Sequence, residues 1–437
     1  MTNSRIIWKM MGYDIKKADK FLKASLHLNR DEFITWQKER KWEIFDFHYQ
    51  NNNFFKKKCN VRISNWDEIP IMTKTDLQIG LNPSMSKGYN SRNAYIANTS
   101  GSSGHPLWFA KDKFCHSLAW SYINQTYKEL SSENSPLEAR FFGSIRRDIK
   151  SHLKEKLKDY FLNRIRFNVF NQTNDYFDEV INIFRRRSFT YLYGYTNSIL
   201  SFANFIKEHS NHTLKEICPS LKFVLLTAEM CSENQRKHMI KNFDVPVYRE
   251  YGASETSIIA IEDQEYKWNI STNRLHIEVV DQDSNPVQFG QKGRLLITDL
   301  YNRAMPMIRY EIGDVGSIEQ IDKSPFMRFR TLDGRLSDII HLANGRKLPG
   351  LTFYYISRSL IENGTNIKRF IITQKKINEF VFEYVSNQEL SQSMKNNIMI
   401  ESKKYLRIDV DYIFKRVKSI ADRPSGKIQQ FFSEVYN

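Results

Sequence analysis

The sequence predicts an α/β fold with two domains, a large layered amino-terminal domain with mainly parallel sheets and a small α+β carboxy-terminal domain. Two observations predict it. Between about residues 95 and 330, strand-length apolar runs alternate with segments of helical periodicity, which is typical of a parallel sheet covered by helices. After about residue 334 the pattern changes to short strands around a single helix. We therefore place the large domain at residues 1–334 and the small domain at residues 335–437.

The elements of the large domain follow from its apolar spacing. Residues 1–60 are expected to be helical, because apolar residues recur at three-to-four spacing. Buried strands are expected at 189–193 and 221–227. A predicted helix follows each strand, at 197–207 and 233–243.

Two later segments of the large domain, 275–280 and 294–298, alternate apolar and polar residues. This pattern predicts an antiparallel sheet or barrel appended late in that domain. In the small domain the pattern predicts three short strands and one polar helix. These elements are expected at 369–373, 380–384 and 410–414 for the strands and at 390–405 for the helix.

The composition predicts a packed protein that binds an anion. The hydrophobic fraction of 41% is enough for a core. The net charge is +16, from 65 Lys and Arg against 49 Asp and Glu, and it attracts anionic ligands. A nucleic-acid- or anionic-surface-binding protein is the alternative class, and it would gather basic and aromatic residues on one face. The basic residues are dispersed along the chain and no nucleic-acid-binding motif is present, so no nucleic-acid partner is expected.

Membrane insertion and secretion are not expected. No window approaches the roughly 18 apolar residues of a membrane span, and the first 13 residues lack the apolar core of a signal peptide. The four cysteines are far apart and form no C-x-x-C pair. They predict neither a disulfide framework nor a zinc knuckle, and they suit a reducing cytoplasm, which is the expected location.

A loop rich in hydroxyl and glycine residues lies between Asn98 and Pro106. Backbone N–H groups and hydroxyls without bulky side chains can surround phosphate oxygens. The loop is not a Walker A motif, because no Gly-Lys-Ser/Thr closes it, and a flexible linker is the alternative interpretation. The candidate phosphate-binding residues are Thr99, Ser100, Gly101, Ser102, Ser103 and Gly104.

A second motif runs from Tyr248 to Thr256. We expect a strand to end at Tyr251, Gly252 to turn the chain, and Glu255 to face the carboxyl end of the sheet, where open α/β sheets bind ligands. An aromatic ring beside a carboxylate suits a nucleobase and its Mg²⁺. The alternative is that Glu255 begins a helix.

Two further motifs lie near the domain boundary and near the end of the chain. Asp314, at an expected strand–turn junction, can accept both hydroxyls of a ribose, and Arg335 can hold a phosphate in a forked geometry. The alternative for Asp314 is an ordinary turn. Lys427 follows a Pro-Ser-Gly sequence and can reach an anionic centre, or it is a surface lysine.

In this order and combination, the four motifs resemble those of the acyl-adenylate-forming (AMP-forming) ligase superfamily. Residues 228–230, 298–306 and 307–310 are similar to the phenylacetate–coenzyme A ligase branch, and most similar to its relatives in capsular polysaccharide biosynthesis. The resemblance covers about residue 60 to the end of the chain. It implies the adenylate-forming ligase fold, in which the small domain is a lid, and it implies ATP and Mg²⁺ as cofactors.

The resemblance also implies a role for each matched residue. The loop 99–104 would hold the β- and γ-phosphates, Glu255 would ligate Mg²⁺, and Lys427 would bridge the substrate carboxylate and the α-phosphate. Asp314 would hold the ribose, and Arg335 the ribose or the α-phosphate region. The adenine slot would be formed by Ala228, Glu229, Tyr251 and Gly252, with Ala253 and Ser254 beside them.

Three positions depart from the family pattern. His105 stands where many relatives have lysine, and Ser337 stands at the usual hinge position, where Asp or Lys is common. Many close relatives have Cys and His just after the Tyr-Gly-x-Ser-Glu motif, which suggests a structural metal. Residues 262–265 contain neither Cys nor His, so no zinc is expected there.

The resemblance therefore implies an ATP- and Mg²⁺-dependent enzyme that converts a carboxylic acid to acyl-AMP, releases pyrophosphate and transfers the acyl group. Coenzyme A is the acceptor expected for the branch. An amine of a sugar or amino acid is the alternative, and a nucleotide-binding scaffold without catalysis is a further one. The expected acyl pocket consists of Phe141, Tyr193, Gly194 and Tyr195, for which core aromatics are the alternative interpretation.

Overall fold

The computed structural model describes residues 8–9, 11–99, 107–133, 135–142, 149–169, 173–322, 324–335, 339–344, 347–349, 367–406, 408–420 and 431–435. The chain folds into two compact units. The first extends to Ile312 and resumes at Gly316–Thr331, and the second contains Gly313–Val315 and the chain from Leu332. This division falls three residues before the boundary that we expected at 334/335, within the strand that leads into it.

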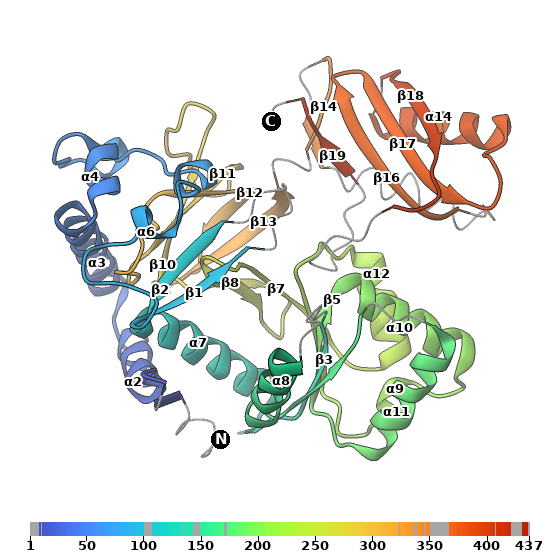
Figure 1. Ribbon diagram of the computed structural model, residues 1–437, viewed down its shortest axis with the longest axis horizontal. Helices are drawn as coiled ribbons and strands as arrows, with labels where there is room; N and C mark the ends of the chain where they lie inside the picture. The colour runs from blue at the N-terminus through green and yellow to red at the C-terminus, as the bar shows by residue number, and fades with distance from the viewer. Residues whose placement is uncertain are drawn as a thin grey trace. The chain divides into compact units, whose positions relative to one another are not determined.

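A single eleven-stranded mixed sheet runs through the large unit (Figure 1). Its strand order is β10-β11-β12-β13-β9-β8-β7-β6-β5-β3-β4. The bounds are β3 Glu138–Phe141, β4 Arg164–Phe167, β5 Tyr191–Tyr195, β6 Phe223–Thr227, β7 Val247–Ala253, β8 Ser257–Glu262, β9 Trp268–Ile270, β10 Leu275–Val280, β11 Gly293–Asp299, β12 Tyr310–Gln320 and β13 Met327–Arg335. A separate two-stranded hairpin joins β1 (Ala94–Asn98) to β2 (Trp108–Asp112).

Strand β7 joins the parallel and antiparallel halves of this sheet. It pairs parallel with β6 and antiparallel with β8. The antiparallel strands β10 and β11 were predicted correctly, but they continue the eleven-stranded sheet rather than forming the expected appended sheet or barrel. Because the turn after β7 is short, the chain returns beside β7 and continues the same sheet.

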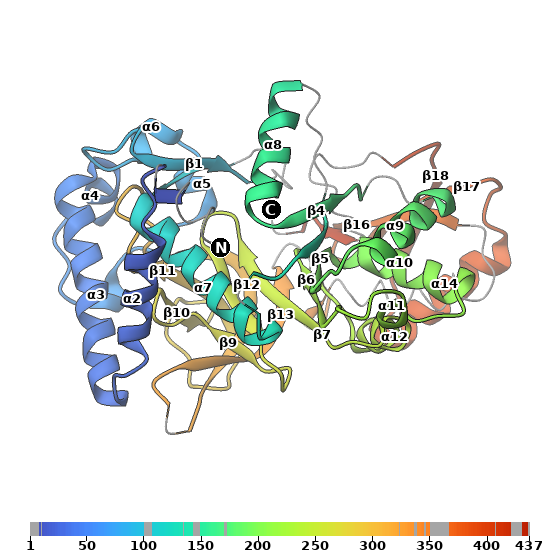
Figure 2. The ribbon, with the colours of Figure 1, turned by 90° about the horizontal axis from the view of Figure 1, so that it is seen from below.

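The helices of the large unit cover both faces of the parallel half. Helices α9, α10 and α12 pack their apolar side chains on one face, and α7 lies on the other face and against α2 (Figure 2). The bounds are α2 Ile15–Ser25, α3 Arg30–Asn51, α4 Asn53–Cys59, α5 Lys74–Leu77, α6 Leu81–Ser84, α7 Lys113–Ser131, α8 Ile149–Phe161, α9 Asn174–Arg186, α10 Thr196–His209, α11 Leu214–Ile217 and α12 Glu233–Phe243, with a 3₁₀ turn at Trp66–Glu68. None of the helices that the structure describes is long and apolar enough to cross a membrane.

Local sequence explains where several of these elements begin. Asn29 and Glu32 form a capping box at the start of α3, and Ser232 and Gln235 form one at α12. The predicted helix at 233–243 is confirmed residue for residue. Strand β5 begins two residues later than predicted, because the chain at 187–189 makes a local turn before pairing with its neighbours.

The second unit has the β-β-α-β order that the sequence predicts. Its four-stranded sheet has the order β18-β17-β16-β19 (Figure 1), and β17 and β18 pair parallel across α14. The bounds are β14 Ile339–His341, β15 Lys347–Pro349, β16 Ile367–Lys376, β17 Glu379–Ser386, α14 Gln392–Leu406, β18 Asp411–Arg416 and β19 Phe431–Ser433. Residues from α14 and both central strands form one apolar core.

Candidate active site

Glu255 lies in a tight turn between β7 and β8. The expected strand end at Tyr251 is wrong by two residues, since β7 continues to Ala253. No helix begins at Glu255, because the chain returns at once as β8. Gly252 permits this close return, since a Cβ atom there would lie 2.5 Å from the carbonyl oxygen of Ser257.

The Glu255 carboxylate is buried at this turn and has a specific partner. Glu255 is only 6% exposed. Its Oε1 accepts a 3.0 Å hydrogen bond from the hydroxyl of Tyr310. Tyr310 is fully buried at the start of β12. A hydrogen bond of this kind fixes the orientation of the carboxylate.

Arg309 anchors the segment that presents Tyr310. Its backbone is left-handed, with φ of 45°, and its buried guanidinium donates to Glu278 at 3.0 Å and to the carbonyl oxygen of Ile69 at 2.9 Å. These bonds tie β12 to the segment after the amino-terminal helices. The sequence indicated Arg309 and Tyr310 only as part of a family signature, and it did not predict either contact.

Lys111, which the sequence analysis missed, supports the same turn from β2. Its Nζ donates to the carbonyl oxygen of Ser254 at 2.8 Å and to the hydroxyl of Ser257. The residue is 1% exposed. Burial lowers the pKa of its ammonium to about 8, against the opposing influence of Cys115 and Asp299. The sequence offered one sign that Lys111 is buried. This lysine directly follows the apolar run 107–110, in the strand that comes after the candidate phosphate loop.

The expected adenine residues lie at the carboxyl ends of two neighbouring strands, β6 and β7. Ala228 is left-handed, with φ of 71°. The Glu229 carboxylate accepts the backbone N–H of Asn197 at 2.8 Å, and its carbonyl oxygen accepts the hydroxyl of Thr196 at 3.1 Å. Glu229 therefore ties the end of β6 to the first turn of α10, and its contact with adenine stays a prediction.

The residues expected in the acyl pocket separate onto two faces of the sheet. Phe141 lies in the core beneath the helices and contacts the ring of Phe202, so the structure supports the core interpretation for it. Tyr193 faces α7, and its hydroxyl donates to Glu250 at 2.7 Å. Gly194 is needed because a Cβ atom there would lie 2.3 Å from the carbonyl oxygen of Phe141.

Tyr195 ends β5 at the carboxyl edge, with its ring centroid 4.3 Å from that of Phe142. Arg140 lies beside these rings, and its guanidinium carbon is 4.6 Å from the Tyr193 ring centroid. Aromatic and charged groups thus meet at this edge, where the acyl pocket is predicted.

The remaining candidates are described only in part. Thr99 exchanges two bonds with Leu107 across the hairpin β1–β2. Asp314 is buried, but it lies inside β12 after a left-handed Gly313, so the expected strand–turn junction is wrong. Arg335 ends β13. Residues 100–104, Lys427 and the side chain of Arg335 lie outside the described part of the structure.

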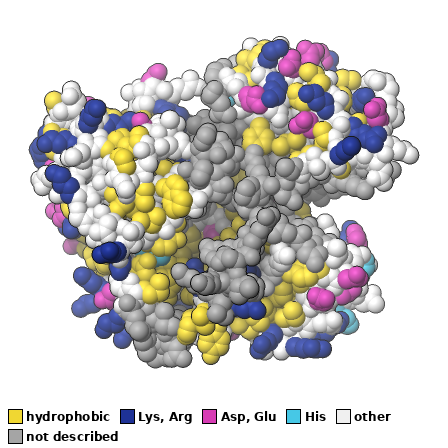
Figure 3. Space-filling view, in the orientation of Figure 1, with side chains coloured by type: hydrophobic (Ala, Val, Ile, Leu, Met, Phe, Trp, Pro, Cys, Tyr) yellow, Lys and Arg dark blue, Asp and Glu magenta, His cyan; other side chains and the backbone are white. Residues whose placement is uncertain are grey.

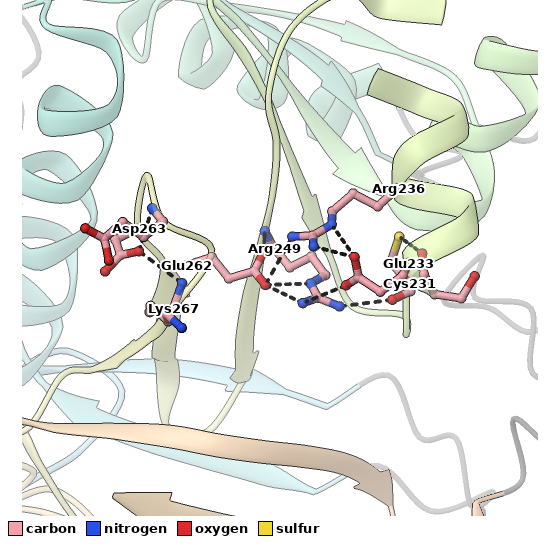
Figure 4. A network of polar contacts seen from close by, with 9 residues as sticks. Cys231, Glu233, Arg236, Arg249, Glu262, Asp263 and Lys267 are labelled. Atoms are coloured by element: carbon pink, nitrogen blue, oxygen red, sulfur yellow. Dashed lines mark hydrogen bonds and ion pairs between the residues drawn. The ribbon is translucent and has the colours of Figure 1, made fainter. Parts of the chain in front are cut away.

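The segment at which relatives were expected to carry a metal holds ion pairs instead (Figure 4). Glu262 is fully buried and accepts two hydrogen bonds of 2.9 Å from Arg249, one from the backbone N–H and one from Nε. Asp263 pairs with Arg328 at 3.1 Å. These contacts join β7, β8 and β13, and the absence of zinc stays a prediction.

The surface charge is spread rather than gathered on the face that Figure 3 shows. Lys and Arg side chains lie among acidic, apolar and uncharged ones over both units (Figure 3). This distribution differs from the continuous basic surface that nucleic-acid binding requires.

The fold is that of the AMP-forming acyl-adenylate ligases, which confirms the predicted resemblance and fold class. No family model matches the sequence. The structure is similar to 2-hydroxyisobutyryl-CoA ligase in complex with R3-HIB-AMP, with a TM-score of 0.70, 13% identity, and coverage of 94% of this chain and 91% of that chain. It is also similar to the amide bond synthetase McbA from Marinactinospora thermotolerans, with a TM-score of 0.52, 15% identity, and coverage of 78% and 69%. In sequence the chain is 23% identical to Protein CapK of Staphylococcus aureus over 424 residues, 91% of this chain and 88% of CapK.

Proposed function

We propose that the protein is an ATP- and Mg²⁺-dependent ligase that activates a carboxylic acid as its acyl-adenylate. The observation that carries the proposal is the buried Glu255 carboxylate, held by Tyr310 in a tight turn at the carboxyl end of β7. A carboxylate is the hard oxygen ligand that Mg²⁺ prefers. Because its oxygens can accept several contacts, the bond from Tyr310 is compatible with a metal ligand.

The first step would join the acid to the nucleotide. A carboxylate oxygen attacks the α-phosphorus of ATP, the bond from that phosphorus to the bridging β-phosphate oxygen breaks, and pyrophosphate leaves. Bound Mg²⁺ would offset the charge that develops on the phosphates. We propose that Lys427 also offsets the negative charge at the α-phosphate. Asp314 would hold the ribose, and Arg335 would hold the ribose or the α-phosphate region. These roles rest on the family resemblance.

The second step would transfer the acyl group and release AMP. Coenzyme A as acceptor is supported by the similarity to a CoA ligase. An amine acceptor is supported by the similarity to an amide bond synthetase and by the resemblance to relatives in capsular polysaccharide biosynthesis. We propose residues 335–437 as a lid whose movement admits the acceptor, and the cytoplasm as the location, where ATP and coenzyme A are available.

A screen of carboxylic acids for ATP–pyrophosphate exchange tests this function. The purified chain is incubated with ATP, Mg²⁺ and single acids from an aromatic, aliphatic, hydroxy and amino acid panel. Acid-dependent exchange in the wild type, with strong loss in Glu255→Gln, supports the proposal. Folded protein that binds Mg²⁺·ATP but exchanges pyrophosphate with no acid of the panel contradicts it. Product analysis with coenzyme A or an amine then identifies the acceptor.

A further inference from the structure

Lys111 places a buried positive charge inside the large unit. The residue is 1% exposed, and among the described residues no carboxylate lies within ion-pairing distance of its ammonium. Buried charges are normally paired, because moving an ion out of water is costly. An unbranched apolar side chain such as methionine would occupy similar space without that cost.

The ammonium makes both of its described bonds to one small element. These acceptors are the carbonyl oxygen of Ser254 at 2.8 Å and the hydroxyl of Ser257. They stand on either side of Glu255, so a single side chain from β2 fixes the entry and the exit of its turn. Tyr310 holds the carboxylate itself from β12.

Charged and titratable groups face Lys111 from each neighbouring element. They are Glu255 on the turn, Cys115 on α7, Asp299 at the end of β11, and Arg274 just before β10. Asp299 is already engaged, because its Oδ1 accepts the backbone N–H groups of Tyr301 and Asn302 at 3.0 and 3.1 Å. Both described hydrogen bonds of the Lys111 ammonium nevertheless go to the turn that carries Glu255.

We infer that Lys111 is a positioning residue for Mg²⁺·ATP, which fixes the turn of Glu255 and places a positive charge behind it. The inference rests on the proposed function. The Mg²⁺·ATP complex keeps a net negative charge, so a nearby buried cation favours its binding at low effective dielectric. Lys111 also follows the candidate phosphate loop 99–104 closely in sequence.

A matched pair of variants tests the inference. Lys111→Met removes the buried ammonium at the turn. Lys41→Met removes a half-buried lysine on α3. Its Nζ lies 3.2 Å from His276 and 4.3 Å from the Trp66 ring centroid, and it contacts no residue of the turn in the described structure. The dissociation constant of Mg²⁺·ATP is measured by calorimetry without any acid substrate, and the melting temperature is measured for each variant.

We expect Lys111→Met to weaken Mg²⁺·ATP binding by roughly tenfold, the loss typical for a bond to a charged group, while Lys41→Met leaves the dissociation constant unchanged. In Lys111→Met/Glu255→Gln the two losses should not add, because both changes act on one turn. Equal dissociation constants in the wild type and Lys111→Met overturn the inference, and so do additive losses in the double variant.

A pH titration of the wild type covers the case in which Lys111→Met does not fold. Binding of Mg²⁺·ATP should weaken as the pH rises through about 8, the pKa of the buried ammonium, whereas a pH-independent dissociation constant between pH 7 and 9.5 contradicts the inference. Because these readouts need no acid, nucleotide binding without acid-dependent pyrophosphate exchange would reject the proposed function alone. Absence of Mg²⁺·ATP binding by the wild type would reject both.

Discussion

The hydroxyl of Tyr310 donates a 3.0 Å hydrogen bond to Oε1 of Glu255 and joins two segments that are 55 residues apart in sequence. Both residues are buried. Arg309, next to Tyr310, is tied in turn to Glu278 and to the chain near Ile69. The position of the Glu255 carboxylate thus depends on contacts that reach the segment following the amino-terminal helices.

Tyr310→Phe should impair nucleotide use more than it impairs folding. The change removes one hydroxyl and leaves the ring in place, so it costs about 1–3 kcal/mol at the Glu255 carboxylate. We expect kcat/KM for Mg²⁺·ATP in pyrophosphate exchange to fall roughly tenfold. The control is Tyr412→Phe in the second unit, which removes a buried hydroxyl bonded to Ser402 at 2.7 Å. Equal kcat/KM in Tyr310→Phe and the wild type would show that the bond has no role in the reaction.

Glu255→Gln should weaken the use of Mg²⁺·ATP far more than the binding of the acid. The amide keeps the size of the side chain but lacks the charge that a hard cation needs. The check is the Mg²⁺ dependence of pyrophosphate exchange together with acid binding measured by calorimetry. If the variant remains inactive at high Mg²⁺ and ATP while its ATP affinity is unchanged, Glu255 has another task.

Lys427→Ala should abolish adenylate formation and leave ATP binding and the melting temperature nearly unchanged. The lysine lies in a Pro/Gly-framed sequence, and its loss should create no cavity. An ammonium that stabilises the charge at the α-phosphate contributes about 3–4 kcal/mol to lowering the barrier, which corresponds to a rate loss of several hundredfold. Near-wild-type pyrophosphate release by the variant with its cognate acid would remove Lys427 from the mechanism.

Acid should destabilise the protein through buried histidines. Burial lowers the pKa of His48 from 6.5 to about 4, and its ring nitrogens contact Ser86 at 3.0 Å and the carbonyl oxygen of Asn302 at 2.9 Å. The unfolded chain binds a proton below pH 6.5 that the folded chain excludes until about pH 4. Stability is therefore complete above pH 6.5 and falls as the pH drops from 6.5 to 4, by about 3 kcal/mol for this residue.

Urea unfolding at pH 7 and at pH 4.5 measures this effect. His48→Gln should show a smaller loss of the free energy of unfolding between these two pH values than the wild type. His212→Gln is the control, because its side chain is 67% exposed. The same loss in all three proteins would contradict the role assigned to His48.

Much of the fold followed from local sequence, and the errors have physical causes. Capping residues and apolar spacing predicted α12 and the order of the second unit. Periodicity cannot report which sheet a strand joins, so β10 and β11 were expected in an appended antiparallel sheet or barrel. The Gly313–Asp314 pair predicted a turn, because glycine and aspartate are common in turns. In the structure, the left-handed Gly313 lies inside β12 instead.

The candidate site was predictable where residue type alone carries the chemistry. Glu255, Tyr251 and Gly252 were recognised from their spacing. Lys111 could not be recognised from the sequence, because its role arises from a bond to Ser254, 143 residues away. No local pattern encodes a pairing at that distance. Phe141 ends β3 and Tyr193 lies in the middle of β5. Their opposite faces are set by the register between the two strands, which pairs Phe141 with Gly194.

Isotope transfer from the acid to AMP tests the central claim most directly. Acid labelled with ¹⁸O in its carboxylate is incubated with the enzyme, ATP, Mg²⁺ and the acceptor, and the phosphorus-containing products are analysed by mass spectrometry. If a carboxylate oxygen attacks the α-phosphorus, the AMP released after acyl transfer carries one ¹⁸O atom and pyrophosphate carries none. Label in inorganic phosphate with formation of ADP, or AMP without label, would contradict acyl-adenylate formation by this protein.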